Sequence, residues 1–109
     1  MSRPIRAFIN CAALQHNLSV IRDHVHQARI MAVVKADAYG HGLLRVARAL
    51  DAVDGFAVLE LEAAIQLREA GFSQPILLLE GFFSIEEIEA IDHYRLSTVI
   101  HCHEQLSML

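Results

Sequence analysis

One short segment of the sequence carries residue types that can do covalent chemistry. It reads AVVKADAYGHG over residues 32–42 and places a single lysine, Lys35, directly after an apolar run. An amine held among apolar neighbours is harder to keep protonated, so a larger neutral fraction can attack a carbonyl and form a Schiff base. A solvated strand end would look the same, so position alone leaves the role of Lys35 open.

The residues around Lys35 indicate a strand that ends in a turn. Val33 and Lys35 are two positions apart and would share one face of an extended strand. Active sites of α/β barrels lie at the carboxyl ends of the strands, where Lys35 would stand above Val33. Gly40 and Gly42 suit either a turn into a helix or a close approach of the backbone to a phosphate. His41, between these glycines, is placed to fix the loop through a hydrogen bond.

The elements that must position this segment follow from the apolar pattern. Short apolar runs alternate with stretches of helical spacing, which is typical of βα units around a parallel sheet and predicts the α/β class. The runs are nearly continuous in hydrophobicity, as expected of core strands covered on both faces. Five such strands are predicted, at residues 5–9, 30–34, 55–59, 75–79 and 96–100.

Helical spacing predicts three helices between these strands. The first begins after Asn10, a residue type favoured at the N-cap. The second follows Gly42. The third covers residues 60–70 and ends at Gly71, where a left-handed C-cap residue belongs.

A fourth helix has the clearest start. Ser84 and Glu87 are spaced as a capping box, in which each side chain accepts a backbone N–H at the start of the helix. Its buried side is predicted to consist of Ile85, Ile88 and Ile91. Residues 103–106 resemble the beginning of another helix, and the chain stops there without a cap or turn. We therefore interpret the sequence as an N-terminal piece of a larger protein.

Composition argues against several classes of function. The 109 residues carry a formal net charge of -4, which provides no basic field for nucleic acid. The apolar runs are far shorter than the roughly 20 residues of a membrane helix, and the start lacks a signal peptide, so we expect no membrane partner and a cytoplasmic location. Cys11 and Cys102 are too few for a disulfide framework and are compatible with a reducing compartment.

The segment AVVKADAYGHG also closely resembles the signature of bacterial alanine racemases. RAFINCAALQHNLSVIR, GFAVLELEAAIQLREAG and PILLLEGFF resemble the same family in the same order, so the resemblance covers essentially the whole chain. It implies a (β/α)8 TIM-type barrel with parallel strands alternating with helices. Residues 1–109 would form about the first half of that barrel, which has about 250 residues when complete, and the family's C-terminal β domain would be absent.

The resemblance implies roles for particular residues. Lys35 would carry pyridoxal 5'-phosphate as an internal aldimine and would act as the base on one face of the α-carbon of alanine. Tyr39 would contact the cofactor phosphate. Leu79 would line the cofactor pocket, although ordinary barrel core explains an apolar residue there equally well. Asp37 stands where family members commonly have Asn.

Racemisation needs a second base on the opposite face of the substrate. The resemblance implies a homodimer in which that base is a tyrosine from the second domain of the partner subunit, a role expected of neither Tyr39 nor Tyr94. By itself the chain would expose a sheet edge and an apolar face, so we expect it to aggregate or to need partners. Without the second base, we also expect it to be inactive alone. Whether the parent enzyme makes D-alanine for peptidoglycan or takes part in alanine breakdown stays open.

Other interpretations compete with the racemase. A non-catalytic pyridoxal-phosphate binding or carrier protein would use a similar lysine but would need a complete barrel, and a structural remnant would bind no cofactor. His101 and His103 flank Cys102 and could share one face of a strand. No third ligand is spaced to complete a zinc site there, so we expect no metal.

Overall fold

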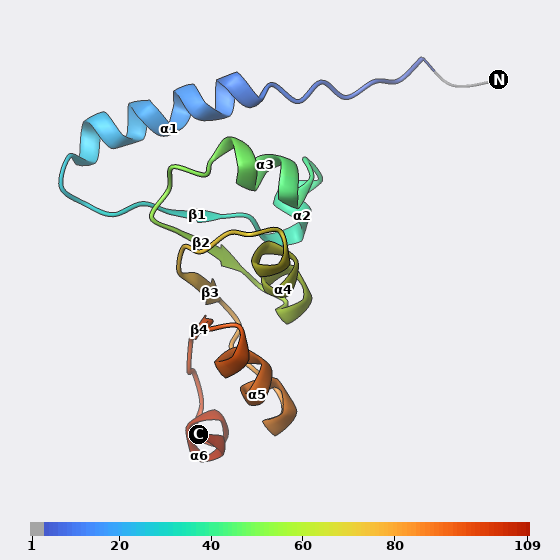
Figure 1. The fold of residues 1–109 in the computed structure, drawn as a ribbon, viewed down its shortest axis with the longest axis vertical. Coiled ribbons are helices and arrows are strands. Elements are labelled where there is room, and N and C mark those ends of the chain that lie inside the picture. Colours follow the sequence, from blue (N-terminus) through green and yellow to red (C-terminus); the bar gives the residue numbers. More distant parts are fainter. Residues whose placement is uncertain (1–3) are drawn as a thin grey trace.

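A four-stranded parallel sheet forms the centre of the computed structural model, which describes residues 4–109. The strands follow one another across the sheet in chain order, and every neighbouring pair is parallel (Figure 1). They are β1 (Met31–Val33), β2 (Gly55–Val58), β3 (Ile76–Leu78) and β4 (Ser97–Thr98). This architecture confirms the α/β class and a partial barrel of the TIM type.

Helices connect the strands and cover one side of the sheet, where Figure 1 shows α3, α4 and α5. The helices are α1 (Cys11–Val25), α2 (Lys35–Tyr39), α3 (Leu43–Ala49), α4 (Leu61–Glu69), α5 (Ile85–His93) and α6 (His103–Met108). The predicted helices are all present, whereas α2 was not predicted. Within residues 4–109, no helix has both the length and the apolarity needed to cross a membrane.

Hydrogen bonds and a backbone angle confirm the predicted ends of three helices. Asn10 caps α1, because its Oδ1 accepts the Ala13 N–H at 3.0 Å. Gly71, directly after the C-cap of α4, has a left-handed φ of 98°. Ser84 Oγ accepts the Glu87 N–H, as a capping box requires.

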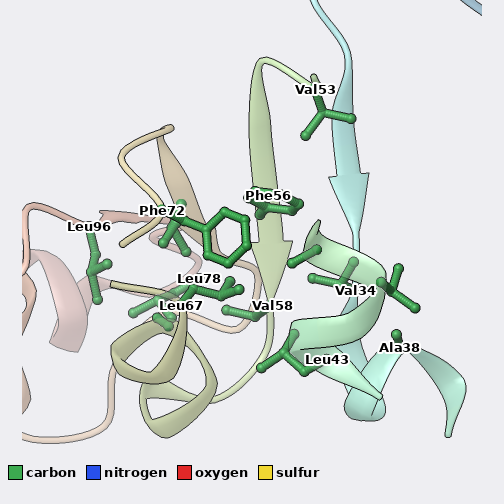
Figure 2. Packing of buried hydrophobic residues seen from close by; sticks show 14 of the residues in the cluster. Val34, Ala38, Leu43, Val53, Phe56, Val58, Leu67, Phe72, Leu78 and Leu96 are labelled. Atoms are coloured by element: carbon green, nitrogen blue, oxygen red, sulfur yellow. The ribbon is translucent and has the colours of Figure 1, made fainter. Parts of the chain in front are cut away.

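The main core lies between the sheet and the covering helices. The rings of Phe56 and Phe72 meet edge to face, with 5.5 Å between their centroids and an interplanar angle of 80° (Figure 2). Such a contact adds specific geometry to the free energy gained by burying both rings. The side chains at the centre of this core are fully buried: Phe56, Val58, Leu67, Ile76 and Leu78.

The opposite face of β1 is open. Met31 is 44% exposed and Val33 is 51% exposed, and both point away from the main core. The prediction that every strand is covered on both faces is therefore wrong for β1. The physical reason is that β1 is an edge strand and residues 4–109 supply no second layer over this face. The expected exposed edge and apolar face of an open sheet are thus confirmed.

Two further expectations about the core are wrong. Residues 5–9 form no strand, and they run away from the sheet (Figure 1) with Ile5 78% and Phe8 87% exposed, because the described chain offers them no neighbouring strand. In α5 no residue is fully buried, and Ile85 is 61% exposed. That helix lies beside β4, the last strand of the sheet, so only part of its apolar side finds cover.

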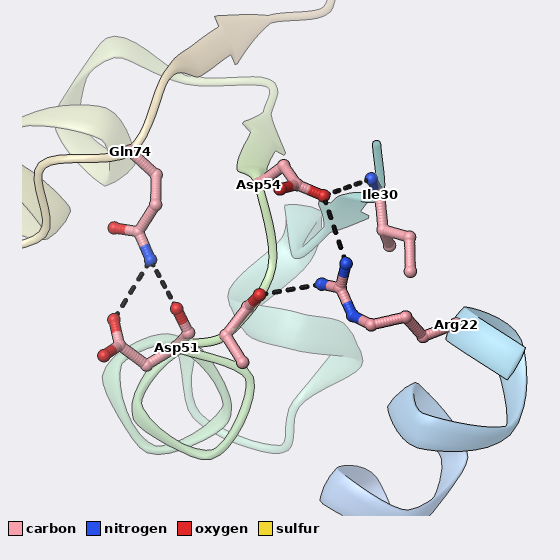
Figure 3. A network of polar contacts seen from close by, with 6 residues as sticks. Arg22, Ile30, Asp51, Asp54 and Gln74 are labelled. Carbon is pink, nitrogen blue, oxygen red and sulfur yellow. Dashed lines mark hydrogen bonds and ion pairs between the residues drawn. The ribbon is translucent and has the colours of Figure 1, made fainter. Parts of the chain in front are cut away.

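A polar cluster ties α1 to the N-terminal ends of β1 and β2 (Figure 3). Asp54 Oδ2 accepts the Ile30 N–H at 2.7 Å and lies 3.7 Å from Arg22 Nη1. The Nη2 atom of Arg22 also donates to the Ala52 carbonyl at 2.8 Å. Both ionic side chains are well exposed, so the ion pair itself contributes little, and the short bond to the Ile30 N–H is the stronger contact.

Replacing Asp54 with alanine should lower the free energy of unfolding by about 1 kcal/mol, because the part-buried Ile30 N–H loses its acceptor. The Asp54→Asn variant should lose less, since its amide oxygen can still accept that N–H. Urea unfolding of both variants measures the difference. An equal loss in both would show that the exposed ion pair with Arg22, rather than the hydrogen bond, stabilises this end of the sheet.

Candidate active site

Lys35 lies directly after β1, at the carboxyl end of the strand, as predicted. Its side chain is partly buried, and it borders a pocket of about 160 Å³. The other lining residues come from α2, from the residues after β2 and from α4: Ala36, Asp37, Leu59, Glu60 and Ala63. The pocket therefore places one amine together with two acidic residues, Asp37 and Glu60, and apolar side chains, where parallel strands end.

The chain leaves the strand just before this lysine. Val34 has a ψ of 29°, so the alternation of side chains along β1 no longer determines the direction of Lys35. The pocket gives its neighbours instead, and sequence reasoning missed Leu59, Glu60 and Ala63 among them. The end of the predicted strand at residues 55–59 was the signal available, because neighbouring parallel strands bring their carboxyl ends to one edge.

Leu79 lies one strand away from the lining residue Leu59. The Leu79 N–H donates to the Val58 carbonyl at 2.8 Å, a bond that belongs to the last pair of β2 and β3, Val58 with Leu78. Leu59 and Leu79 each follow directly after that pair. Leu79 is half-buried and does not itself line the Lys35 pocket. Its predicted contact with a cofactor stays a prediction.

The residues after Lys35 form one turn of left-handed helix. Four consecutive residues that are not glycine have φ between 54° and 56°: Ala36, Asp37, Ala38 and Tyr39. Each left-handed residue with a Cβ costs about 1–2 kcal/mol, so surrounding contacts must hold the turn. This turn was not predicted. Its signals were the small side chains, the aspartate and the following Gly40, all types that tolerate such a backbone better than bulky or branched residues.

Hydrogen bonds hold the left-handed turn in place. Asp37 Oδ1 accepts the Leu43 N–H at 2.8 Å, and the Asp37 carbonyl accepts the Gly42 N–H at 3.0 Å. His41 Nδ1 donates to the Ala38 carbonyl at 2.9 Å, which confirms that this histidine fixes the loop. Asp37 thereby joins the turn after Lys35 to the first residue of α3.

Positive φ values explain both glycines of the loop. Gly40 has φ 85° and Gly42 has φ 95°, a region that residues with a side chain rarely adopt. A turn into α3 therefore accounts for them, and a close approach to a phosphate is an additional possibility that the backbone alone does not require. Tyr39 is 70% exposed and does not line the Lys35 pocket, so its contact with a cofactor phosphate also stays a prediction.

Asp37→Ala should lower the free energy of unfolding by about 1 kcal/mol, because α3 loses the acceptor of its first N–H and the left-handed turn loses a tie. Asp37→Asn should retain most of the stability, since an amide oxygen can accept the same N–H. Urea unfolding of both variants compares them. A loss in Asp37→Asn as large as in Asp37→Ala would mean that the charge of Asp37, and not its acceptor, is what matters.

His101, near the C-terminus, contacts the backbone of the loop after β3. His101 Nε2 donates to the Glu80 carbonyl at 2.9 Å. Across residues 4–109, the structure brings together no group of three or more His, Cys, Asp or Glu side chains able to hold a metal ion.

Comparisons with known proteins match this chain to a single family over nearly its whole length. Residues 9–109 match the family model described as alanine racemase, N-terminal domain. The chain is 94% identical over 109 residues to an alanine racemase of Nitrosomonas europaea and 62% identical to one of Nitrosospira multiformis, and each match covers 100% of the chain and 30% of the relative. The chain thus spans about 30% of the length of these curated relatives.

Solved structures agree with the sequence matches. The alanine racemase of Acinetobacter baumannii aligns with a TM-score of 0.89 and 39% identity, over 93% of this chain and 30% of that one. The biosynthetic alanine racemase of Pseudomonas aeruginosa aligns with a TM-score of 0.85 and 41% identity, over 90% of this chain and 28% of that one. The fold of this chain is therefore shared with these alanine racemases.

Proposed function

The chain belongs to the alanine racemase N-terminal domain family, and on that premise we propose that it supplies the cofactor lysine of an enzyme that interconverts L-alanine and D-alanine. One observation carries the proposal. Lys35, the lone lysine of the sequence, borders a pocket at the carboxyl end of a barrel strand, where enzymes of this fold place their reacting groups.

The residues of the pocket fit pyridoxal 5'-phosphate. Lys35 offers a partly buried amine, and Leu59 offers apolar surface for an aromatic ring. Leu79 follows the neighbouring strand at the same edge of the sheet. We propose that Lys35 holds the cofactor, that Leu79 contacts its ring and that Tyr39 contacts its phosphate. When bound, the cofactor withdraws electrons from the α-carbon of the substrate, so that the α-proton becomes acidic enough to leave.

The protein's own contribution is to move that proton. Once its amine is released from the cofactor, Lys35 would take the proton on one face of the α-carbon and could return it to the same face. Asp37 holds the turn that follows Lys35 and so limits where its backbone can move. Inversion requires a second base on the other face.

Neither tyrosine of the chain is placed as that second base. Tyr94 follows α5, its ring meets His93 edge to face at 4.8 Å, and its carbonyl accepts a bond from Arg68 on the helical side of the sheet. Tyr39 belongs to the same strand-end segment as Lys35. We therefore propose that the second base comes from a partner subunit of a homodimer.

The proposal is tested in a hybrid protein, in which this chain replaces the matching 109 residues of the full-length Nitrosomonas europaea relative. We expect the hybrid to bind pyridoxal phosphate and to convert L-alanine into D-alanine at a rate comparable to that of the unaltered relative. Chiral chromatography measures the product, and circular dichroism with gel filtration controls for folding. A folded hybrid that binds the cofactor without racemising alanine would instead support a carrier protein.

A further inference from the structure

Gln105 is the only buried polar residue in the described part of the chain, with 3% of its surface exposed. It lies in α6, and both ends of its side-chain amide are bonded. Its Oε1 accepts the His101 N–H at 2.7 Å, and its Nε2 donates to the Phe82 carbonyl at 3.1 Å, 23 residues away in sequence. Burying an amide is unfavourable unless its bonds are satisfied, so these partners have to stay in place.

Gly81 packs against this amide. A Cβ at Gly81 would lie 2.6 Å from Gln105 Nε2 and 2.6 Å from the Val99 carbonyl oxygen, and the φ of Gly81 is 81°. The backbone atom of Val99 cannot move aside cheaply, so only glycine allows this approach. Together with the bond from His101 Nε2 to the Glu80 carbonyl at 2.9 Å, these contacts join the loop after β3 to the loop after β4. We call Gly81, His101 and Gln105 the Gln105 cluster.

The Gln105 cluster begins at Gly81, two residues beyond Leu79. The cluster bonds to the carbonyls of Glu80 and Phe82, and Gly81 packs against the Gln105 amide. On the side of the sheet, the Leu79 N–H donates to the Val58 carbonyl at 2.8 Å. Leu79 is therefore fixed between the sheet and the cluster. Both lie at the carboxyl ends of the strands, the same edge that carries Lys35.

We propose that Gln105 is a positioning residue of the cofactor site. By bonding the loops after β3 and β4 to each other, it would hold Leu79 in place for contact with a cofactor bound at Lys35. It acts through the backbone of residues 80–82 and does not itself touch the cofactor. This inference rests on the proposed function, because it assumes that the cofactor binds at Lys35.

The Gln105→Met variant of the hybrid protein tests the proposal, since it keeps much of the shape of the side chain and removes both hydrogen bonds. We expect the dissociation constant for pyridoxal phosphate to rise about tenfold to a hundredfold, the size of effect that a small displacement in a site produces. We also expect faster hydrogen exchange at residues 79–84 in the cofactor-free protein. The His101→Ala variant removes the bond to Glu80 and the 3.3 Å contact between His101 Nε2 and Gln105 Nε2, but keeps the bond from the His101 N–H to Gln105. It should show the same changes to a smaller degree.

Asp54→Ala in the same hybrid is the matched control, because it removes a bond at the opposite end of the strands. It should reduce stability without changing cofactor affinity or exchange at residues 79–84. Unchanged affinity and exchange in both cluster variants would overturn the proposal and leave Gln105 a purely structural residue. If Gln105→Met does not fold, the same measurements on His101→Ala decide.

The two proposals fail in different ways. If the unaltered hybrid binds no pyridoxal phosphate, the proposed function is wrong and the cofactor role of Gln105 fails with it. Exchange at residues 79–84 in the cofactor-free variants then still shows whether the Gln105 cluster holds the segment after Leu79. If the unaltered hybrid binds the cofactor and the cluster variants bind it equally well, only the role of Gln105 is wrong.

Discussion

Lys35→Ala is expected to lower the rate of alanine racemisation by the hybrid protein by about 10²–10⁴-fold, the usual contribution of a positioned acid or base. The loss has two causes in the proposed mechanism: the cofactor loses its covalent anchor, and one face of the substrate loses its base. Lys35 is the single lysine of the chain, so no neighbouring lysine from residues 1–109 can replace it. The rate at which D-alanine forms from L-alanine at saturating cofactor measures the effect.

Lys35→Arg provides the control for charge. Arginine keeps a positive charge of similar reach but stays protonated at every accessible pH, so it cannot take the α-proton. It should be as inactive as Lys35→Ala. Added methylamine should restore part of the rate only to Lys35→Ala, where the shortened side chain leaves room for a free amine. A Lys35→Ala variant that retains its rate without methylamine would disprove the role of Lys35.

Arg68→Ala should produce the largest loss of stability among the changes considered, about 2–4 kcal/mol. The guanidinium of Arg68 donates to four backbone carbonyls, those of Phe72 at 2.9 Å, Gln74 at 2.6 Å, Tyr94 at 2.8 Å and Arg95 at 3.1 Å. These acceptors belong to the connections that lead into β3 and β4. Removing one side chain would leave all four carbonyls without this donor.

The surroundings of Arg68 make its bonds harder to replace. Burial lowers the pKa of the Arg68 guanidinium, and the nearby positive charge of Arg95 lowers it further. Arg68 is partly buried, and a hydrogen bond lost there is replaced less well by water. An arginine still remains protonated at ordinary pH, so the four bonds persist.

Hydrogen exchange at the amides of β3 and β4, together with urea unfolding of the hybrid protein, measures the effect of Arg68→Ala. Arg68→Lys should recover only part of the loss, because an ammonium cannot reproduce the planar set of donors that reaches four carbonyls. Arg95→Ala removes the neighbouring charge and keeps the Arg95 carbonyl, so it should have little effect. Equal exchange in Arg68→Ala and the unaltered protein would show that water satisfies these carbonyls just as well.

Local sequence signals predicted much of the fold. The capping residues Asn10 and Ser84 and the left-handed Gly71 mark helix ends through contacts within a few residues, so spacing was enough to find them. Continuous apolar runs located all four strands of the sheet. The same pattern wrongly added residues 5–9, because an extended apolar segment becomes a core strand only where a neighbouring strand exists to pair with it.

In the candidate site, too, some features were predicted from local sequence and others depend on tertiary contacts. The sequence predicted that Lys35 stands at the end of a strand, and it predicted that His41 makes a hydrogen bond within the loop. The pocket that Lys35 shares with Leu59 depends on how β1 and β2 pair, and the left-handed turn depends on contacts that outweigh its local cost.

The amino-acid sequence by itself determined the four strands of the sheet and most of the helices, the family and the lysine on which the proposed chemistry depends. It could do so because these features rest on residue type and short-range spacing. Only the tertiary structure decided which polar residues hold the framework together. In the sequence, Gln105 and Arg68 look like ordinary helix residues. Their hydrogen-bond partners, however, lie up to 23 and 27 residues away. Contacts at that separation exist only after the chain has folded, since folding alone brings the loops of neighbouring strands together.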